Sequence, residues 1–191
     1  MNTVLEHTQQ TLEVKRSKFI AHLFPYAMFD DVMAALRAEH PKARHFVTAY
    51  RYLNAFDQVV EGCSDDGEPK GTSGKPTLAV LQGNELINVG IITVRYFGGV
   101  KLGTGGLVRA YGDAVNLVIG EAVVSGFEKE AAARFVCDYS AMGMVEYDLK
   151  GCGVRVVEKR FEAADVTFEV RAPGAALDAF FSKVKRLVRK V

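Results

Sequence analysis

Glycine and basic residues gather in one stretch whose composition suits the binding of an anion. The stretch runs Arg95-Tyr-Phe-Gly-Gly-Val-Lys-Leu-Gly-Thr-Gly-Gly-Leu-Val-Arg-Ala-Tyr-Gly-Asp113, and six of the chain's 18 glycines fall between Gly98 and Gly112. Glycine adopts positive φ angles and lets a ligand approach the backbone closely. Three basic residues, Arg95, Lys101 and Arg109, add positive charge. Together these residue types predict a phosphate site.

A strand and a helix are needed to position this stretch. Residues 87–94 are apolar and largely β-branched, which predicts a buried strand. Apolar residues from Leu102 to Val118 recur at helical spacing, which predicts a helix packed on a sheet. The start of that helix would offer unpaired N–H groups and a positive dipole end to an anion. The alternative is that the glycines only allow tight packing. The stretch is neither a P-loop nor a complete G-x-G-x-x-G motif, since Val108 replaces the third glycine.

A second polar loop precedes this unit. Residues 61–76 combine glycine, proline and acidic side chains, which predicts a loop that leads into a helix capped by Thr72 or Ser73. The loop carries three carboxylates, those of Asp65, Asp66 and Glu68. Carboxylate oxygens are hard ligands of the kind that Mg²⁺ prefers. The alternative is that these residues only form a turn. Both loop–helix junctions could face one cleft.

The whole chain has the composition of a globular protein. It has 191 residues, 49% of them apolar, and a net charge of +1. This composition argues against a disordered chain and against a protein that coats nucleic acid by bulk electrostatics, and it leaves a local basic groove as an alternative. The three cysteines match no metal motif or disulfide framework, residues 1–19 contain no apolar signal core, and no run is long enough to span a membrane. We therefore expect a cytoplasmic protein.

The chain is expected to form two α+β domains with a boundary near Gly126. In the first, we expect a strand pair or one bent strand over 11–24, a helix over 29–40 with Asp30 as its cap, and a strand over 45–52. In the second, the pattern predicts a strand at 135–139, a helix over 140–149 capped by Ser140, strands at 152–158 and 165–170, and a final helix over 175–188. This β-α-β-β-α order is five of the six elements of a ferredoxin-like unit.

Two motif blocks, residues 64–76 and 95–111, together with residues 15–19 and 43–45, resemble those of the YigZ/IMPACT family. The resemblance implies that residues 1–126 form an IMPACT-type N-terminal domain with the fold of ribosomal protein S5 domain 2. It also implies that residues 127–191 form a small ferredoxin-like domain similar to those of elongation factor G. Family members often add a final strand, and here we expect the chain to stop after the last helix. Eukaryotic relatives regulate translation, and nucleic-acid or ribosome association is proposed for bacterial members by analogy of fold.

The favoured function is a non-enzymatic binding protein, linked to translation regulation, that contacts RNA or the ribosome. In this hypothesis basic side chains contact phosphates, glycine-rich backbone donates hydrogen bonds and two aromatic rings offer a stacking surface. The residues concerned are Arg95, Tyr96, Phe97, Gly98, Gly99, Lys101, Gly103, Thr104, Gly105, Gly106 and Arg109, with Lys75 and His45 as further phosphate contacts.

Two alternatives stay open. One is an enzyme or sensor in which Mg²⁺, held by Asp65, Asp66 and Glu68, accompanies a phosphate ligand. No base is matched to a nucleophile, and Cys63 stands beside acidic residues that disfavour its thiolate. The other alternative is a protein-interaction module without a small ligand, for which an exposed apolar or aromatic patch is expected. A basic tail, residues 183–190, is either the solvated face of a helix or a nucleic-acid contact.

Overall fold

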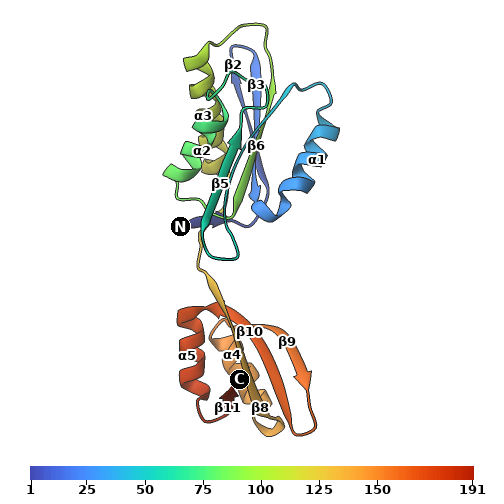
Figure 1. The fold of residues 1–191 in the computed structure, drawn as a ribbon, viewed down its shortest axis with the longest axis vertical. Helices are drawn as coiled ribbons and strands as arrows, with labels where there is room; N and C mark the ends of the chain where they lie inside the picture. The colour runs from blue at the N-terminus through green and yellow to red at the C-terminus, as the bar shows by residue number, and fades with distance from the viewer. The chain divides into compact units, whose positions relative to one another are not determined.

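The computed structural model describes residues 1–191, and the chain divides into two compact units, residues 1–127 and 128–191. Both units combine helices with antiparallel sheets, so the mixture of helices and strands expected of α+β domains is confirmed (Figure 1). No helix combines the length and the apolar character needed to cross a membrane.

The first unit is built on a five-stranded antiparallel sheet. Its strand order is β2-β3-β6-β4-β5, which places β6 in the centre. The bounds are β2 Thr8–Val14, β3 Ser17–Pro25, β4 His45–Leu53, β5 Val59–Ser64 and β6 Val89–Tyr96. A separate two-stranded sheet pairs β1 (Asn2–Val4) with β7 (Val124–Gly126).

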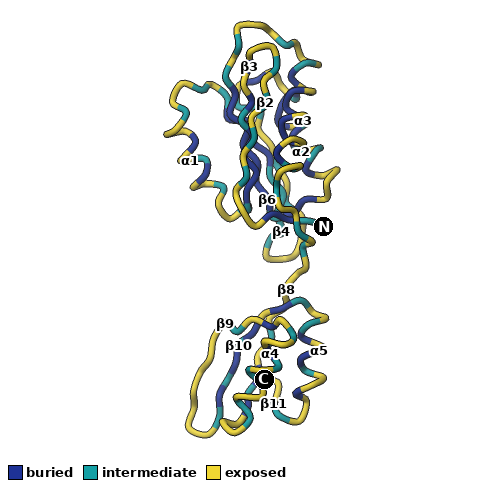
Figure 2. Tube along the Cα trace, turned by 180° about the vertical axis from the view of Figure 1, so that it is seen from behind, coloured by how far each residue is buried: buried dark blue, intermediate teal, exposed yellow.

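Helices cover both faces of the five-stranded sheet. Figure 1 shows α2 (Gly74–Gly83) and α3 (Thr104–Glu121) on one face and α1 (Phe29–Glu39) on the other. Alternate side chains of β6 therefore enter different cores: Ile91 packs with α2 and α3, whereas Ile92 packs with α1. The apolar run that predicted a buried strand reflects burial on both faces, and Figure 2 shows the buried residues gathered along the inner strands.

Three local expectations for the first unit need correction or refinement. Of the two alternatives for residues 11–24, the strand pair is confirmed: they form a hairpin with Lys15 and Arg16 at positive φ in its turn. Asp30 does not cap α1, because Met28 holds that position; Asp30 instead lies in the first turn, where its charge favours the helix dipole. The loop predicted from residue 61 begins later, because β5 continues to Ser64 by pairing with β4.

The second unit packs two helices on one antiparallel sheet of order β11-β8-β10-β9. Its elements follow one another as β8 (Glu130–Asp138), α4 (Met142–Gly151), β9 (Arg155–Phe161), β10 (Asp165–Pro173), α5 (Gly174–Val184) and β11 (Val188–Lys190). The core contains a stacked pair of rings, Phe135 and Phe168, whose centroids are 5.1 Å apart, and Phe180 of α5 packs against Phe135. Ser140 does not cap α4, because it lies in a short 3₁₀ turn that precedes the helix.

The expectation that the chain stops after a helix ending at residue 188 was wrong. Helix α5 ends at Val184, the Leu187 amide closes a turn onto the Val184 carbonyl, and β11 then pairs with β8. Leu187 and Val188 fit helical spacing, but both also pack against the core from the turn and the strand. Pairing with β11 also satisfies the outer backbone groups of β8, which a longer helix would leave unpaired.

Ending the chain at Leu187 is expected to lower the free energy of unfolding of the second unit by about 1 kcal/mol, because the half-buried Val188 leaves the core. Amide hydrogen exchange should accelerate in β8 around Phe135 and Cys137, whose register partners are lost. Exchange in β6 of the first unit serves as the control and should not change. Unaltered exchange in β8 would show that β11 does not protect this edge.

Candidate functional site

A buried ion pair joins the end of β6 to the acidic loop. Arg95 Nη1 lies 2.6 Å from Glu68 Oε1, and the two side chains are only 7% and 3% exposed. Tyr111 of α3 donates its hydroxyl to the same carboxylate oxygen at 2.7 Å. Burial, and then the neighbouring Glu68 carboxylate, raise the pKa of Tyr111 above its ordinary value, so it remains a hydrogen-bond donor. A strand, a loop and a helix are thus tied at one point.

This arrangement changes the roles expected of two residues. Glu68 is occupied by Arg95 and Tyr111, so it is not a free ligand for Mg²⁺. Arg95 was expected to contact phosphate, yet one arm of its guanidinium is committed to Glu68. Its Nε, however, is buried and has no hydrogen-bond partner in the protein. A buried N–H group without an acceptor is costly and uncommon in proteins.

Asp65 fills the N-terminal end of α2. Its carboxylate accepts hydrogen bonds from the backbone N–H groups of Gly71, Ser73 and Gly74 and from the Ser73 hydroxyl, at 2.7 to 3.2 Å. Burial alone would raise the pKa of Asp65, but these hydrogen bonds outweigh it and lower the pKa to about 2. Of the two residues expected to cap α2, Ser73 does hold the N-cap position, but its hydroxyl donates to Asp65 and the capping acceptor is the Asp65 carboxylate.

Asp66 joins the acidic loop to the start of β4. Its carboxylate accepts a hydrogen bond of 2.6 Å from the Phe46 amide and lies 4.0 Å from Arg37. Its carbonyl accepts a hydrogen bond of 2.9 Å from His45 Nδ1, which fixes the orientation of the imidazole. The three loop carboxylates therefore serve three separate internal contacts. No group of three or more acidic, histidine or cysteine side chains gathers in this structure as a metal would require, so the expected Mg²⁺ set is not assembled.

Two pockets lie on either side of Arg95 and Phe97. The first, here called the α3 pocket, has a volume of about 360 Å³ and is lined by Glu68, Pro69, Arg95, Phe97, Lys101, Leu102, Gly103, Thr104 and Leu107. The second, here called the His45 pocket, has a volume of about 410 Å³ and is lined by Lys42, Arg44, His45, Arg95, Tyr96 and Phe97. Phe97 is 58% exposed and its ring centroid lies 5.8 Å from the Arg95 guanidinium carbon. An exposed aromatic ring thus stands between two partly basic pockets.

The glycines of the stretch have different structural roles. Gly103, at φ 73°, precedes α3, and no side chain caps this helix. Gly105 and Gly106 lie in its first turn but outside the pocket lining, and Gly99 adopts φ 86° in open space. Gly98 packs against the β2–β3 turn, where a Cβ would lie 2.1 Å from the Arg16 carbonyl carbon. Gly98 therefore allows tight packing of the backbone, which was the alternative to phosphate binding for these glycines.

Some expected residues are brought to the pockets and others are not. Lys75 and Arg109 are exposed on α2 and α3 and line neither pocket. Tyr96 is half-buried and its hydroxyl hydrogen-bonds His40 Nδ1 at 3.0 Å. Sequence reasoning missed Lys42 and Tyr111. A tyrosine on the buried stripe of a predicted helix signals a need for a polar partner, but nothing in the sequence marked Lys42.

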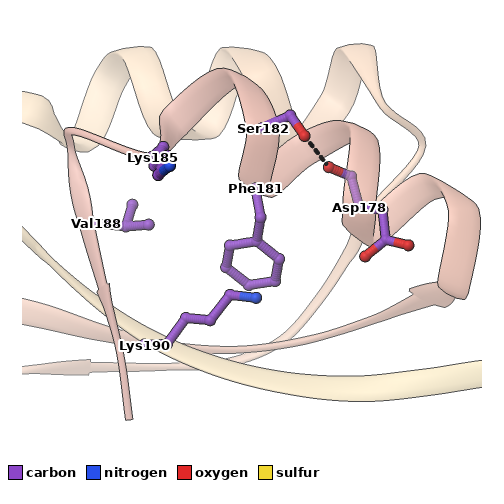
Figure 3. A pocket seen from close by; sticks show the side chains of 6 residues that line it. All are labelled: Asp178, Phe181, Ser182, Lys185, Val188 and Lys190. Carbon is purple, nitrogen blue, oxygen red and sulfur yellow. Dashed lines mark hydrogen bonds between the residues drawn. The ribbon is translucent and has the colours of Figure 1, made fainter.

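Other pockets have a different character. Figure 3 shows one of about 480 Å³ in the second unit, between α5 and β11, where Lys190 Nζ lies 4.0 Å from the centroid of the Phe181 ring. No buried polar group lacks a partner there. A pocket of about 510 Å³ in the first unit is lined by Tyr26 and Tyr52, whose rings stack, together with Val4, Leu5 and Leu53. Neither of these two pockets combines unpaired cationic side chains with the uncapped N-terminal end of a helix.

Two segments match known domains. Residues 15–119 match the Impact N-terminal domain, and residues 135–189 match a domain of unknown function, DUF1949. An IMPACT family member from Haemophilus influenzae is 38% identical over 155 residues, which cover 79% of this chain and 75% of the relative. The chain belongs to the IMPACT family.

Two further similarities extend over most of this IMPACT family chain. The IMPACT family member YigZ from Escherichia coli is 37% identical over 178 residues, 90% of this chain and 85% of the relative. A crystal structure of a hypothetical protein is 31% identical, with a TM-score of 0.70, and the alignment covers 100% of this chain and 95% of that chain. The family membership expected from the two motif blocks is confirmed.

In this IMPACT family chain, Glu68→Ala is expected to lower the free energy of unfolding by roughly 3–5 kcal/mol, because it leaves Arg95 buried without a counter-charge. Tyr111→Phe, which keeps the ion pair, should cost roughly 2 kcal/mol. Urea unfolding followed by circular dichroism measures both. Replacing Arg95 and Glu68 together by methionine should recover part of the Glu68→Ala loss. A Glu68→Ala loss no larger than that of Tyr111→Phe would contradict the importance of the ion pair.

Asp65→Ala is expected to lower the free energy of unfolding at neutral pH by about 1 to 2 kcal/mol, because α2 loses its cap. The pKa of Asp65 is lowered in the folded state, so its contribution is present above the ordinary value of 3.8 and disappears as the pH falls toward about 2. Urea unfolding at several pH values should show the gap between wild type and Asp65→Ala closing over that interval. Asp178→Ala, on the exposed side of α5, is the control and should show no such gap.

Proposed function

We propose that this protein is a non-enzymatic, cytoplasmic binding protein linked to translation regulation, which contacts RNA or the ribosome through the surface around Phe97. The observation that carries the proposal is an exposed aromatic ring between two pockets that supply cations. Bases of single-stranded nucleic acid stack on such rings regardless of sequence, while flanking cations contact the phosphates. This combination of features is typical of single-strand binding surfaces.

The cations of this surface are available to a ligand. Lys42 and Arg44 on one side of Phe97 and Lys101 on the other are exposed and take part in no ion pair. The acidic loop beside them does not oppose an anion as strongly as its sequence suggested, because Glu68 is paired with Arg95 and the Asp65 carboxylate is hydrogen-bonded to the N-terminal end of α2. The local field at the two pockets is therefore more favourable to phosphate than the net charge of the chain suggests.

The link to translation rests on family membership. The resemblance to the YigZ/IMPACT family implies relatives in eukaryotes that regulate translation. We further propose that residues 1–126 have the fold of ribosomal protein S5 domain 2 and that residues 127–191 are ferredoxin-like. The β-α-β-β-α-β order of the second unit supports the latter assignment.

The proposal predicts salt-dependent binding of single-stranded RNA and of 70S ribosomes. Lys42→Ala/Arg44→Ala removes two phosphate contacts, so the slope of log affinity against log salt should fall by about 1.4, at ~0.7 for each contact to a single strand. Phe97→Ala should weaken RNA binding roughly tenfold or more by loss of stacking, with the slope unchanged. Fluorescence anisotropy with a labelled oligonucleotide and ribosome co-sedimentation are the measurements.

Lys75→Ala/Arg109→Ala is the matched control, because it removes one lysine and one arginine that line neither pocket. The control should bind as the wild type does. Equal losses in both double variants would show that binding reflects general charge rather than this surface. The absence of wild-type binding well above ~10⁻⁴ M, where even non-specific contacts are detected, would overturn the proposal.

A further inference from the structure

The α3 pocket differs from the His45 pocket in having a helix start in its wall. Gly103 and Thr104, at the N-terminal end of the 18-residue helix α3, line it. The first turn of α3 contains no acidic residue and receives no side-chain cap. At α2, by contrast, the equivalent N–H groups are taken by Asp65. The chain thus supplies an anion to one of these helix starts and leaves the other open.

A second and independent feature of the α3 pocket also points to an anionic ligand. Arg95 lines this pocket with a side chain that is only 7% exposed, and its Nε finds no acceptor in the protein. Glu68 satisfies Nη1 and balances one positive charge. The charges that remain near the pocket are the Lys101 ammonium and the positive end of the α3 dipole, which together suit an anion of between one and two negative charges.

The rest of the pocket suits an organic group attached to that anion. Pro69, Leu102 and Leu107 provide apolar wall, and the ring of Phe97, which also lines the His45 pocket, adds aromatic surface. The volume of about 360 Å³ leaves room beside a phosphate for a sugar or a base. An inorganic ion alone would leave these apolar contacts unused.

From these features we infer that the α3 pocket binds a phosphate monoester, either the terminal 5′-phosphate of an RNA strand or a free nucleotide. Its oxygens accept hydrogen bonds from the first N–H groups of α3 and from the Arg95 guanidinium that lines the pocket, and Lys101 adds charge. If the phosphate belongs to the end of an RNA strand, the inference rests on the proposed function. If it belongs to a free nucleotide, the inference is independent of the proposed function. A 5′-hydroxyl strand would lack these contacts and bind only through the surface around Phe97.

The test compares one single-stranded RNA oligonucleotide with a 5′-phosphate and with a 5′-hydroxyl, and adenosine 5′-monophosphate with adenosine. Wild type is expected to bind each phosphorylated probe about tenfold more tightly than its partner. Gly105→Asp places a carboxylate in the first turn of α3, where there is open space and an acidic residue favours the helix. It should abolish the discrimination. Gly105→Asn has nearly the same size without the charge and should retain it.

The outcomes separate the two proposals. Discrimination between the RNA probes that Gly105→Asp abolishes supports the inference with the RNA end as the source. Discrimination between the mononucleotide and adenosine alone supports it with a free nucleotide as the source, whether or not RNA binds. Equal binding within both pairs by wild type overturns the inference, and the proposed function then survives only if RNA binds. Persistent discrimination in Gly105→Asp, with the fold intact by circular dichroism, would place the phosphate elsewhere and also overturn it.

Discussion

The architecture around the pockets depends on the buried contact between Arg95, Glu68 and Tyr111. Glu68 belongs to a loop, and its burial is tolerated only because a guanidinium and a hydroxyl both donate to it. The same contact holds Arg95 against the sheet and fixes α3 relative to β6. Removing one charge leaves the other unpaired in an apolar setting, so the three groups act as a unit. The position of the acidic loop beside the glycine-rich helix start follows from this unit.

In the first unit, the free N–H groups at the start of α2 receive a side-chain acceptor from the protein, whereas those at the start of α3 receive no side-chain cap. Helix α2 receives the Asp65 carboxylate from its own loop, and hydrogen bonds from the Gly71, Ser73 and Gly74 N–H groups and from the Ser73 hydroxyl lower the pKa of that carboxyl. Helix α3 has glycines and no acidic residue in the same place. Because the backbone geometry of a helix start is general, the free N–H groups and the dipole at the start of α3 also favour an anion.

Sequence patterns predicted the positions of helices and strands better than they predicted the contacts between side chains. The apolar run of β6 and the helical spacing of α3 depend on local periodicity and were recognised, as was the family from its two motif blocks. The pairing of Arg95 with Glu68 was not, since it depends on a sheet register and a loop path that bring together residues 27 positions apart. Competition between acceptors for the N–H groups of α2 was also not visible in the sequence: Ser73 had the character of a cap, but the Asp65 carboxylate is the better acceptor. Strand β11 was missed because three residues carry too little periodicity to distinguish a strand from the end of a helix.

Gly98 has a consequence for the loop that carries Phe97 and Lys101. Its missing side chain lets the backbone lie directly on the β2–β3 turn, and its amide donates to the buried Ser17 hydroxyl at 3.1 Å. The loop is therefore held at Gly98 and again at the first turn of α3. A segment anchored at both ends has already lost much of its conformational entropy during folding. If a ligand binds at Phe97 as proposed, it meets a preorganised surface, because the conformational entropy of this loop is already lost when the chain folds.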